Sequence, residues 1–108
     1  MKKNVSTNQS IDEKAYWIAR VSQNGLELEL APSALKGDKE VVLAAVAQDG
    51  LALQFASDML KNDKVVVLAA VAQDKWALQY ASPELRNDRE VVLAAVKKNG
   101  YELEHASP

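Results

Sequence analysis

The feature that most constrains this chain is an internal repeat. The run Asp63–Asp74 recurs with few changes 25 residues earlier and 25 residues later, over 38–49 and 88–99. The stretches 38–62 and 63–87 share 18 of their 25 positions, which is more than chance produces. Self-similarity at such a period is typical of an array of small units, each of which stacks on its neighbours because it cannot bury its own apolar face.

In this frame the chain divides into a tail and one repeat domain. Residues 1–12 are polar and mostly without periodicity, which predicts a flexible N-terminal tail. The domain, residues 13–108, consists of unit 1 (13–37), unit 2 (38–62), unit 3 (63–87) and an incomplete unit 4 (88–108). Unit 1 is the most divergent. Its Arg20 replaces an alanine of the later units, as expected for a polar capping unit at the end of an array.

Each unit predicts a long helix, a break and shorter helical turns. Asp63 and its equivalents precede the apolar run and fit an N-cap. A valine-rich run also occurs in buried strands, but the capping aspartate, the Ala-Ala pair and the length of the run favour helix. We therefore expect an all-α fold, a short, solenoid-like helical-repeat array of about four units of 25 residues.

A glycine follows the long helix in three of the four units. Gly25, Gly50 and Gly100 stand where a left-handed C-cap is commonly found. Unit 3 has Lys75 at this position. Since a side chain disfavours the left-handed conformation, we expect Lys75→Gly to stabilise the protein.

The segment after this position is short and ambiguous. In 51–56 and 76–81 apolar and polar residues alternate, which is compatible with a strand. Helix is preferred because Leu, Ala and Gln are helix formers. Ser82-Pro83 then predicts a one-turn helix, with Ser82 as the cap and proline in the first turn.

Composition excludes several functional classes. With 108 residues and 48% hydrophobic content the chain fits one domain, and a net charge of -2 argues against a nucleic-acid binder. Without cysteine and with one histidine, neither a disulfide nor a metal or cofactor site is expected. No run reaches the roughly 20 apolar residues of a membrane span. We expect no membrane association and a cytoplasmic protein, with secretion without a cleaved signal as the alternative.

The repeat resembles a family known only as a domain of unknown function, which occurs in tandem copies in bacterial and protist proteins. The residues that carry the resemblance are Asn87–Val96, Asn99-Gly100 and Tyr80–Leu85. The resemblance covers about residues 13–108. It implies an α-helical repeat architecture and brings no activity and no catalytic residues.

No group of residues predicts catalysis, and we expect the protein not to be an enzyme. His105 stands in the register of Leu30, Phe55 and Tyr80, so a packing ladder explains it. The recurring serines are expected caps, because no base accompanies them to make a nucleophile. Each capping aspartate is followed by a basic residue, and this pattern does not fit a calcium loop.

Positions that differ between units are the informative surface. On the short helices they predict a ladder along one side of the array, and stacked repeats present such surfaces to proteins and peptides. We therefore expect a repeat scaffold that binds a protein or peptide partner and is itself a monomer or weak homodimer. The alternative is a helix-turn-helix-like nucleic-acid-binding module, which is disfavoured by the net charge. The candidate interaction residues are Glu27, Glu29, Gln54, Gln79, Glu102 and Glu104.

Overall fold

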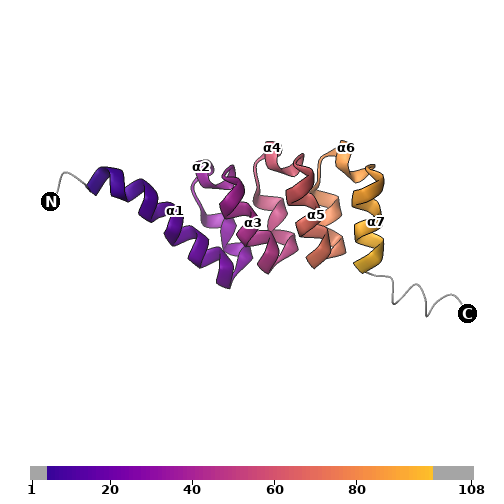
Figure 1. Cartoon of the computed structure of the whole chain (residues 1–108), viewed down its shortest axis with the longest axis horizontal. Helices are drawn as coiled ribbons and strands as arrows, with labels where there is room; N and C mark the ends of the chain where they lie inside the picture. Colours follow the sequence, from indigo (N-terminus) through magenta and orange to yellow (C-terminus); the bar gives the residue numbers. More distant parts are fainter. Residues whose placement is uncertain (1–4, 99–108) are drawn as a thin grey trace, which may run out of the picture.

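The computed structural model describes residues 5–98, with side chains over 13–97. It is all-α, and no strand occurs in this described part. The long helices and the one-turn helices are α-helical, and in units 1 to 3 a 3-10 helix separates them (Figure 1). The elements are α1 (Val5–Gln23), η2 (Gly25–Leu30), α2 (Ser33–Lys36), α3 (Lys39–Gln48), η3 (Gly50–Phe55), α4 (Asp58–Lys61), α5 (Lys64–Gln73), η4 (Lys75–Tyr80), α6 (Pro83–Arg86) and α7 (Arg89–Lys98).

The units stack in chain order. The long helices α1, α3, α5 and α7 lie side by side, each in contact with the next, and the 3-10 helices η2, η3 and η4 form a second row (Figure 1). The one-turn helices α2, α4 and α6 lie along one edge. Each unit therefore contacts only its neighbours in the described part of the chain, as a repeat array requires.

The long helices begin where the sequence predicts. The side chain of Asp63 accepts hydrogen bonds from the backbone N–H groups of Val65 and Val66, at 2.9 and 3.2 Å. Asp38 and Asp88 make the equivalent bonds at the starts of α3 and α7. An N-cap of this kind stabilises a helix by about 1 kcal/mol.

The segments that alternate in polarity are 3-10 helices. A 3-10 helix has three residues per turn, so positions three apart share a face. In unit 2 the buried residues of this segment are Gly50, Leu53 and Ala56, with Ala52 beside them. The pattern Gly-x-x-Leu-x-x-Ala is therefore the sequence signal for this element, and the prediction of helix over strand is confirmed.

The predicted left-handed C-cap is wrong. No residue in the described part of the chain has a positive φ. The residue before the glycine is extended and its side chain caps the following 3-10 helix: the carboxylate of Asp49 accepts from the N–H of Leu51 at 3.0 Å. Lys75→Gly therefore does not stabilise the protein by relieving a left-handed conformation, because Lys75 does not have one.

The core lies between the long helices and the 3-10 row. On α5 the residues Val66, Val67, Ala70 and Val71 have no exposed surface. Their equivalents on α3 are also fully buried. The valine-rich run thus buries two neighbouring faces of each inner long helix, α3 and α5, because each of them has a long helix on both sides and a 3-10 helix beside it.

The chain start differs from its prediction in one respect. α1 begins at Val5, so residues 5–12, expected to belong to a tail, form part of a helix. The one-turn helix of unit 1 also differs, because Pro32 stands at the capping position and provides no side-chain bond, whereas Ser57 and Ser82 do. Within residues 5–98 the helices lack the combination of length and apolar character that crossing a bilayer needs.

Candidate interaction surface

Three of the predicted surface residues form a row along the 3-10 helices, here called the side row. Glu29, Gln54 and Gln79 occupy the same position of η2, η3 and η4. Glu29 and Gln79 are exposed, whereas Gln54 is half-buried and donates from its amide nitrogen to the carbonyl of Leu51 at 3.1 Å. Glu102 and Glu104 lie outside the described residues.

Two further rows on the 3-10 helices are apolar. Their members Leu26, Leu30 and Trp76 are exposed, whereas Leu51, Phe55 and Tyr80 are half-buried. In each 3-10 helix they are the second and the sixth residue, so every row crosses three units. Trp76 is 63% exposed and Leu30 is 62% exposed, although side chains of this size normally lie in a core. One row is Leu26, Leu51 and Trp76, and the other is Leu30, Phe55 and Tyr80.

Glu27 does not belong to the side row. It occupies the position of Ala52 and Ala77, which are fully buried in the next two units. Its carboxylate accepts a hydrogen bond from Nε of Arg20, and the same guanidinium donates to the hydroxyl of Tyr16 at 2.6 Å. This polar cluster covers the free end of unit 1, in agreement with the capping role predicted for Arg20.

The repeated glycine is explained by close packing between units. A Cβ placed on Gly25 would lie 2.3 Å from the carbonyl oxygen of Ala45, and one on Gly50 would lie 2.2 Å from that of Ala70. The N–H of Gly25 also donates to the side-chain oxygen of Gln48 at 2.6 Å. Only glycine permits this approach of one unit to the next.

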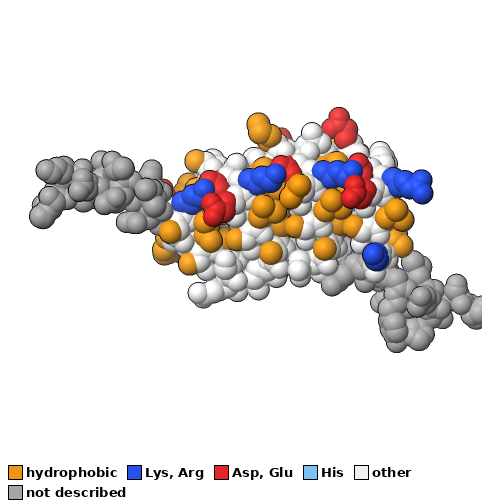
Figure 2. Space-filling view, viewed as in Figure 1, with side chains coloured by type: hydrophobic (Ala, Val, Ile, Leu, Met, Phe, Trp, Pro, Cys, Tyr) orange, Lys and Arg blue, Asp and Glu red, His pale blue; other side chains and the backbone are white. Residues whose placement is uncertain are grey.

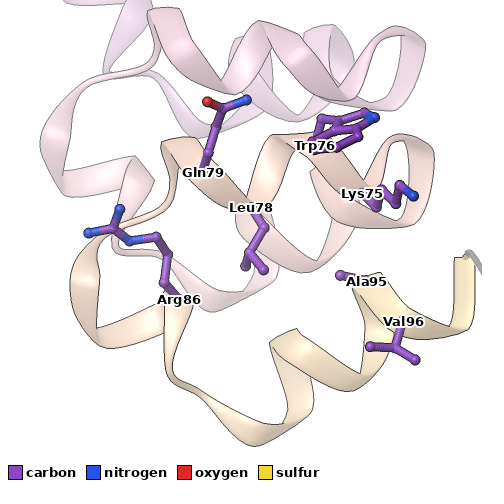
Figure 3. A pocket seen from close by; sticks show the side chains of 7 residues that line it. All are labelled: Lys75, Trp76, Leu78, Gln79, Arg86, Ala95 and Val96. Carbon is purple, nitrogen blue, oxygen red and sulfur yellow. The ribbon is translucent and has the colours of Figure 1, made fainter.

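Where unit 3 has Lys75 in place of the glycine, a pocket lies between η4 and α7 (Figure 3). Its volume is about 600 Å³. Leu78 lies on one side, with Ala95 and Val96 across from it on α7, and Arg86 lies at the opposite end from Lys75. The apolar lining is thus bordered by two cationic side chains. The lining residues are Lys75, Trp76, Leu78, Gln79, Arg86, Ala95 and Val96.

A row of alternating charges follows the first turns of the long helices, on the face shown in Figure 2. A lysine of each unit binds the capping aspartate of the next: Lys39 pairs with Asp63 at 3.0 Å and Lys64 with Asp88 at 3.2 Å. Lys64 also pairs with Glu90 at 2.9 Å, whereas unit 3 has Val65 at the equivalent position. Lys14 repeats the arrangement between units 1 and 2.

These contacts change the pKa of the capping carboxyls. Partial burial raises the pKa of Asp63, but hydrogen bonds from Lys39 and from the N–H of Val66 outweigh burial, and the pKa lies below its ordinary value. For Asp88 the largest cause is the N–H of Val91, which lowers the pKa. The caps are therefore ionised at neutral pH and serve structure.

The potential metal ligands of the described residues lie apart from one another. No group of three or more potential metal ligands comes together among the residues that the structure places. His105 lies outside these residues. What the sequence did not identify is the pocket and its residues Leu78 and Arg86. The available signal was Lys75, the departure from the repeated glycine.

Comparison with known proteins gives one family. The profile described as Domain of unknown function (DUF4116) matches three times in tandem, over residues 18–61, 38–86 and 63–108. These matches overlap, since each window spans nearly two of the 25-residue units. No curated protein matches the chain, and no solved structure does.

Proposed function

We propose a function for this chain, which belongs to the DUF4116 family of domains of unknown function. It is a non-enzymatic scaffold that binds a protein or peptide along the side formed by the 3-10 helices η2, η3 and η4. The observation that carries the proposal is the set of three parallel rows on η2, η3 and η4. Apolar side chains accompany a row of amide and carboxylate groups, and this is the composition of a surface that buries side chains and orients a partner by hydrogen bonds.

The stack supports this role because it fixes the spacing of the rows. Successive units are joined by backbone hydrogen bonds, from the N–H of Ser57 to the carbonyl of Lys36 at 3.0 Å and from Ser82 to Lys61 at 2.9 Å. The hydroxyl of Ser82 also donates to Asn62 at 2.7 Å. A rigid surface loses little conformational entropy when a partner binds, which favours affinity.

The nucleic-acid alternative receives less support. The second helix of units 1 to 3 is a six-residue 3-10 helix, and Lys75 is the one basic residue on η2, η3 and η4. The lysines of the charge row contact carboxylates of the next unit and are thereby neutralised. A phosphate backbone is bound by unpaired Lys and Arg side chains in larger number.

The test is affinity capture with the whole chain as bait, followed by identification of the retained proteins. The variant Gln54→Arg with Gln79→Arg places two charges on the side row. The matched control, Ala47→Arg with Ala72→Arg, adds the same charges at exposed positions of the long helices α3 and α5. We expect one or more partners that the control retains and the side-row variant loses.

The proposal fails if no protein is retained, or if the side-row variant and the control retain the same proteins. Circular dichroism of each variant shows that the loss does not result from unfolding. Titration with a labelled DNA or RNA duplex is the discriminating experiment for the alternative, because saturable and salt-dependent binding supports a nucleic-acid-binding module instead.

A further inference from the structure

Asn24 precedes Gly25, and a glycine in this position makes an asparagine chemically labile. The backbone nitrogen of the glycine, which no side chain shields, attacks the amide carbon of the asparagine. A C–N bond forms, the attacking nitrogen loses its proton to solvent, and the side-chain nitrogen leaves as ammonia. Water then opens the cyclic imide and gives either aspartate or isoaspartate, in which the main chain is one carbon longer.

In this fold the nitrogen that must attack is engaged by the next unit. The N–H of Gly25 donates to Oε1 of Gln48, across the junction between units 1 and 2, at 2.6 Å. A hydrogen bond to a neutral acceptor favours the protonated nitrogen over the deprotonated one. The backbone also has little room to move, because a Cβ on Gly25 would lie 2.3 Å from the carbonyl oxygen of Ala45. The closed junction therefore opposes the attack.

The asparagine side chain is held in place as well. Its oxygen accepts from the N–H of Leu26 at 3.2 Å and thereby caps η2. Units 2 and 3 have Asp49 and Asp74 in the same position, and each caps its 3-10 helix with the same bond. An aspartate in place of Asn24 therefore fits η2. Isoaspartate, with its additional backbone carbon, does not fit where the two units meet.

We propose that Asn24-Gly25 is a latent deamidation site that Gln48 and the junction between units 1 and 2 keep unreactive. Opening of this junction frees the N–H of Gly25, and water reaches the site because Asn24 is exposed. Isoaspartate then prevents the two units from closing, so a transient opening becomes permanent. The reaction needs no partner, and the site is therefore independent of the function proposed above.

The test is the rate of deamidation of the whole chain in mildly alkaline buffer, measured by peptide mapping with mass spectrometry. Mapping separates Asn24 from the other Asn-Gly pair, Asn99-Gly100. A synthetic peptide with the sequence of residues 20–30 gives the rate without the fold. We expect Asn24 to react about tenfold more slowly in the protein than in the peptide, since the reaction requires local opening.

Variants at position 48 identify the protecting group. Gln48→Ala removes the acceptor and should raise the rate at Asn24 about threefold or more, the effect of losing one hydrogen bond. Gln48→Glu keeps an oxygen acceptor and should retain the slow rate. The matched control is Gln73→Ala, the same change at the equivalent exposed position of α5, and it should leave the rate at Asn24 unchanged. Circular dichroism shows that each variant is folded.

Three results would overturn the proposal. One is an equal rate at Asn24 in the protein and in the peptide, because the fold then gives no protection. Another is a rate that Gln48→Ala changes no more than Gln73→Ala does, because Gln48 then has no specific role. The third concerns the product. The isoaspartate form, separated by chromatography, should melt at a lower temperature than Asn24→Asp, and equal melting temperatures would show that the junction accepts the longer backbone.

Discussion

The junctions on the two sides of unit 3 differ although the helices that form them are nearly identical in sequence. Between units 2 and 3, Gly50 lies against the carbonyl of Ala70 with no room for a Cβ. Between units 3 and 4 the equivalent residue is Lys75, and a pocket of about 600 Å³ is found there. Two features distinguish the second junction: position 75 carries a side chain, which excludes the approach that Gly50 makes, and the segment of unit 4 equivalent to η4 lies outside the described residues.

The comparison teaches that the apolar run determines the long helices, whereas the residue that follows a long helix determines how closely it can approach the backbone of the next unit. Leu53 is fully buried at the first junction, and its equivalent Leu78 is only partly buried at the second. In a repeat array stability is a sum of unit and interface terms. A weaker interface at one end therefore lets the terminal unit open without unfolding the rest.

The largest expected effect is that of truncating the leucine at the closed junction. Leu53→Ala should lower the free energy of unfolding by about 2 to 5 kcal/mol, since the side chain is fully buried. Leu78→Ala removes the same atoms from the lining of the pocket and should cost less. Urea unfolding of both variants measures the two values. Equal losses would contradict the difference between the junctions.

The next largest loss of stability is expected when a methyl group is added at Gly50, where unit 2 approaches the backbone of unit 3. Gly50→Ala places a Cβ 2.2 Å from the carbonyl oxygen of Ala70 and should cost about 1 to 3 kcal/mol through overpacking. Lys75→Ala leaves a Cβ that is already accommodated and should change stability by no more than about 0.5 kcal/mol. Thermal melts compare the pair, and a Gly50→Ala protein as stable as the parent would refute the packing role of glycine.

A smaller effect is expected from acid. The pKa values of Asp38, Asp63 and Asp88 lie below the ordinary 3.8 in the folded protein. Their contribution to stability is complete above pH 3.8 and is lost as the pH falls through the lower folded pKa values. Urea midpoints between pH 6 and about pH 2 should therefore decline, and less steeply when all three residues are Asn.

Variants with a single Asp replaced by Asn show which aspartate contributes most to the loss of stability in acid. Lys39 meets one carboxylate at the closed junction, whereas Lys64 meets two at the open one. Asp88→Asn leaves Glu90 as a partner for Lys64, so Asp63→Asn should flatten the acid profile more. A profile that neither substitution changes would mean that the charge row does not stabilise the stack.

The smallest effect is expected on the exposed side of the array. Gln79→Ala should alter the unfolding free energy by no more than about 0.5 kcal/mol, because the side chain is exposed. Gln54→Ala also removes the hydrogen bond to Leu51 and serves as the comparison. A large loss at Gln79 would show that the side row is part of the core.

The sequence was sufficient to predict the all-α repeat, the aspartate caps and the polar end of unit 1, because each rests on local chemistry such as that of Asp63 or Arg20. The 3-10 geometry was not predicted, since six residues such as 51–56 fit more than one period. The packing role of Gly50 was not predicted, for a different reason. A close approach to Ala70 depends on the neighbouring unit, and one unit viewed alone suggests a helix cap instead.

For the candidate site, the row of Glu29, Gln54 and Gln79 followed from comparing units, because equivalent positions of a stack align. The same comparison predicts Glu27 on this surface, but the equivalent residues Ala52 and Ala77 are fully buried. This burial depends on packing between units and is not evident from the sequence of unit 1. The pocket beside Lys75 needed three elements together, η4, α6 and α7, and no sequence pattern contains that arrangement.

Native-state hydrogen exchange tests the difference between the two junctions most directly. The amides of α5 and α7 are compared in one sample under the same conditions, since 89–96 nearly repeats 64–71 in sequence. We predict slow exchange in α5, limited by unfolding of the stack, and faster exchange in α7 through local opening. Equal protection of the two helices would contradict the account, because the junction at Lys75 would then be as strong as the junction at Gly50.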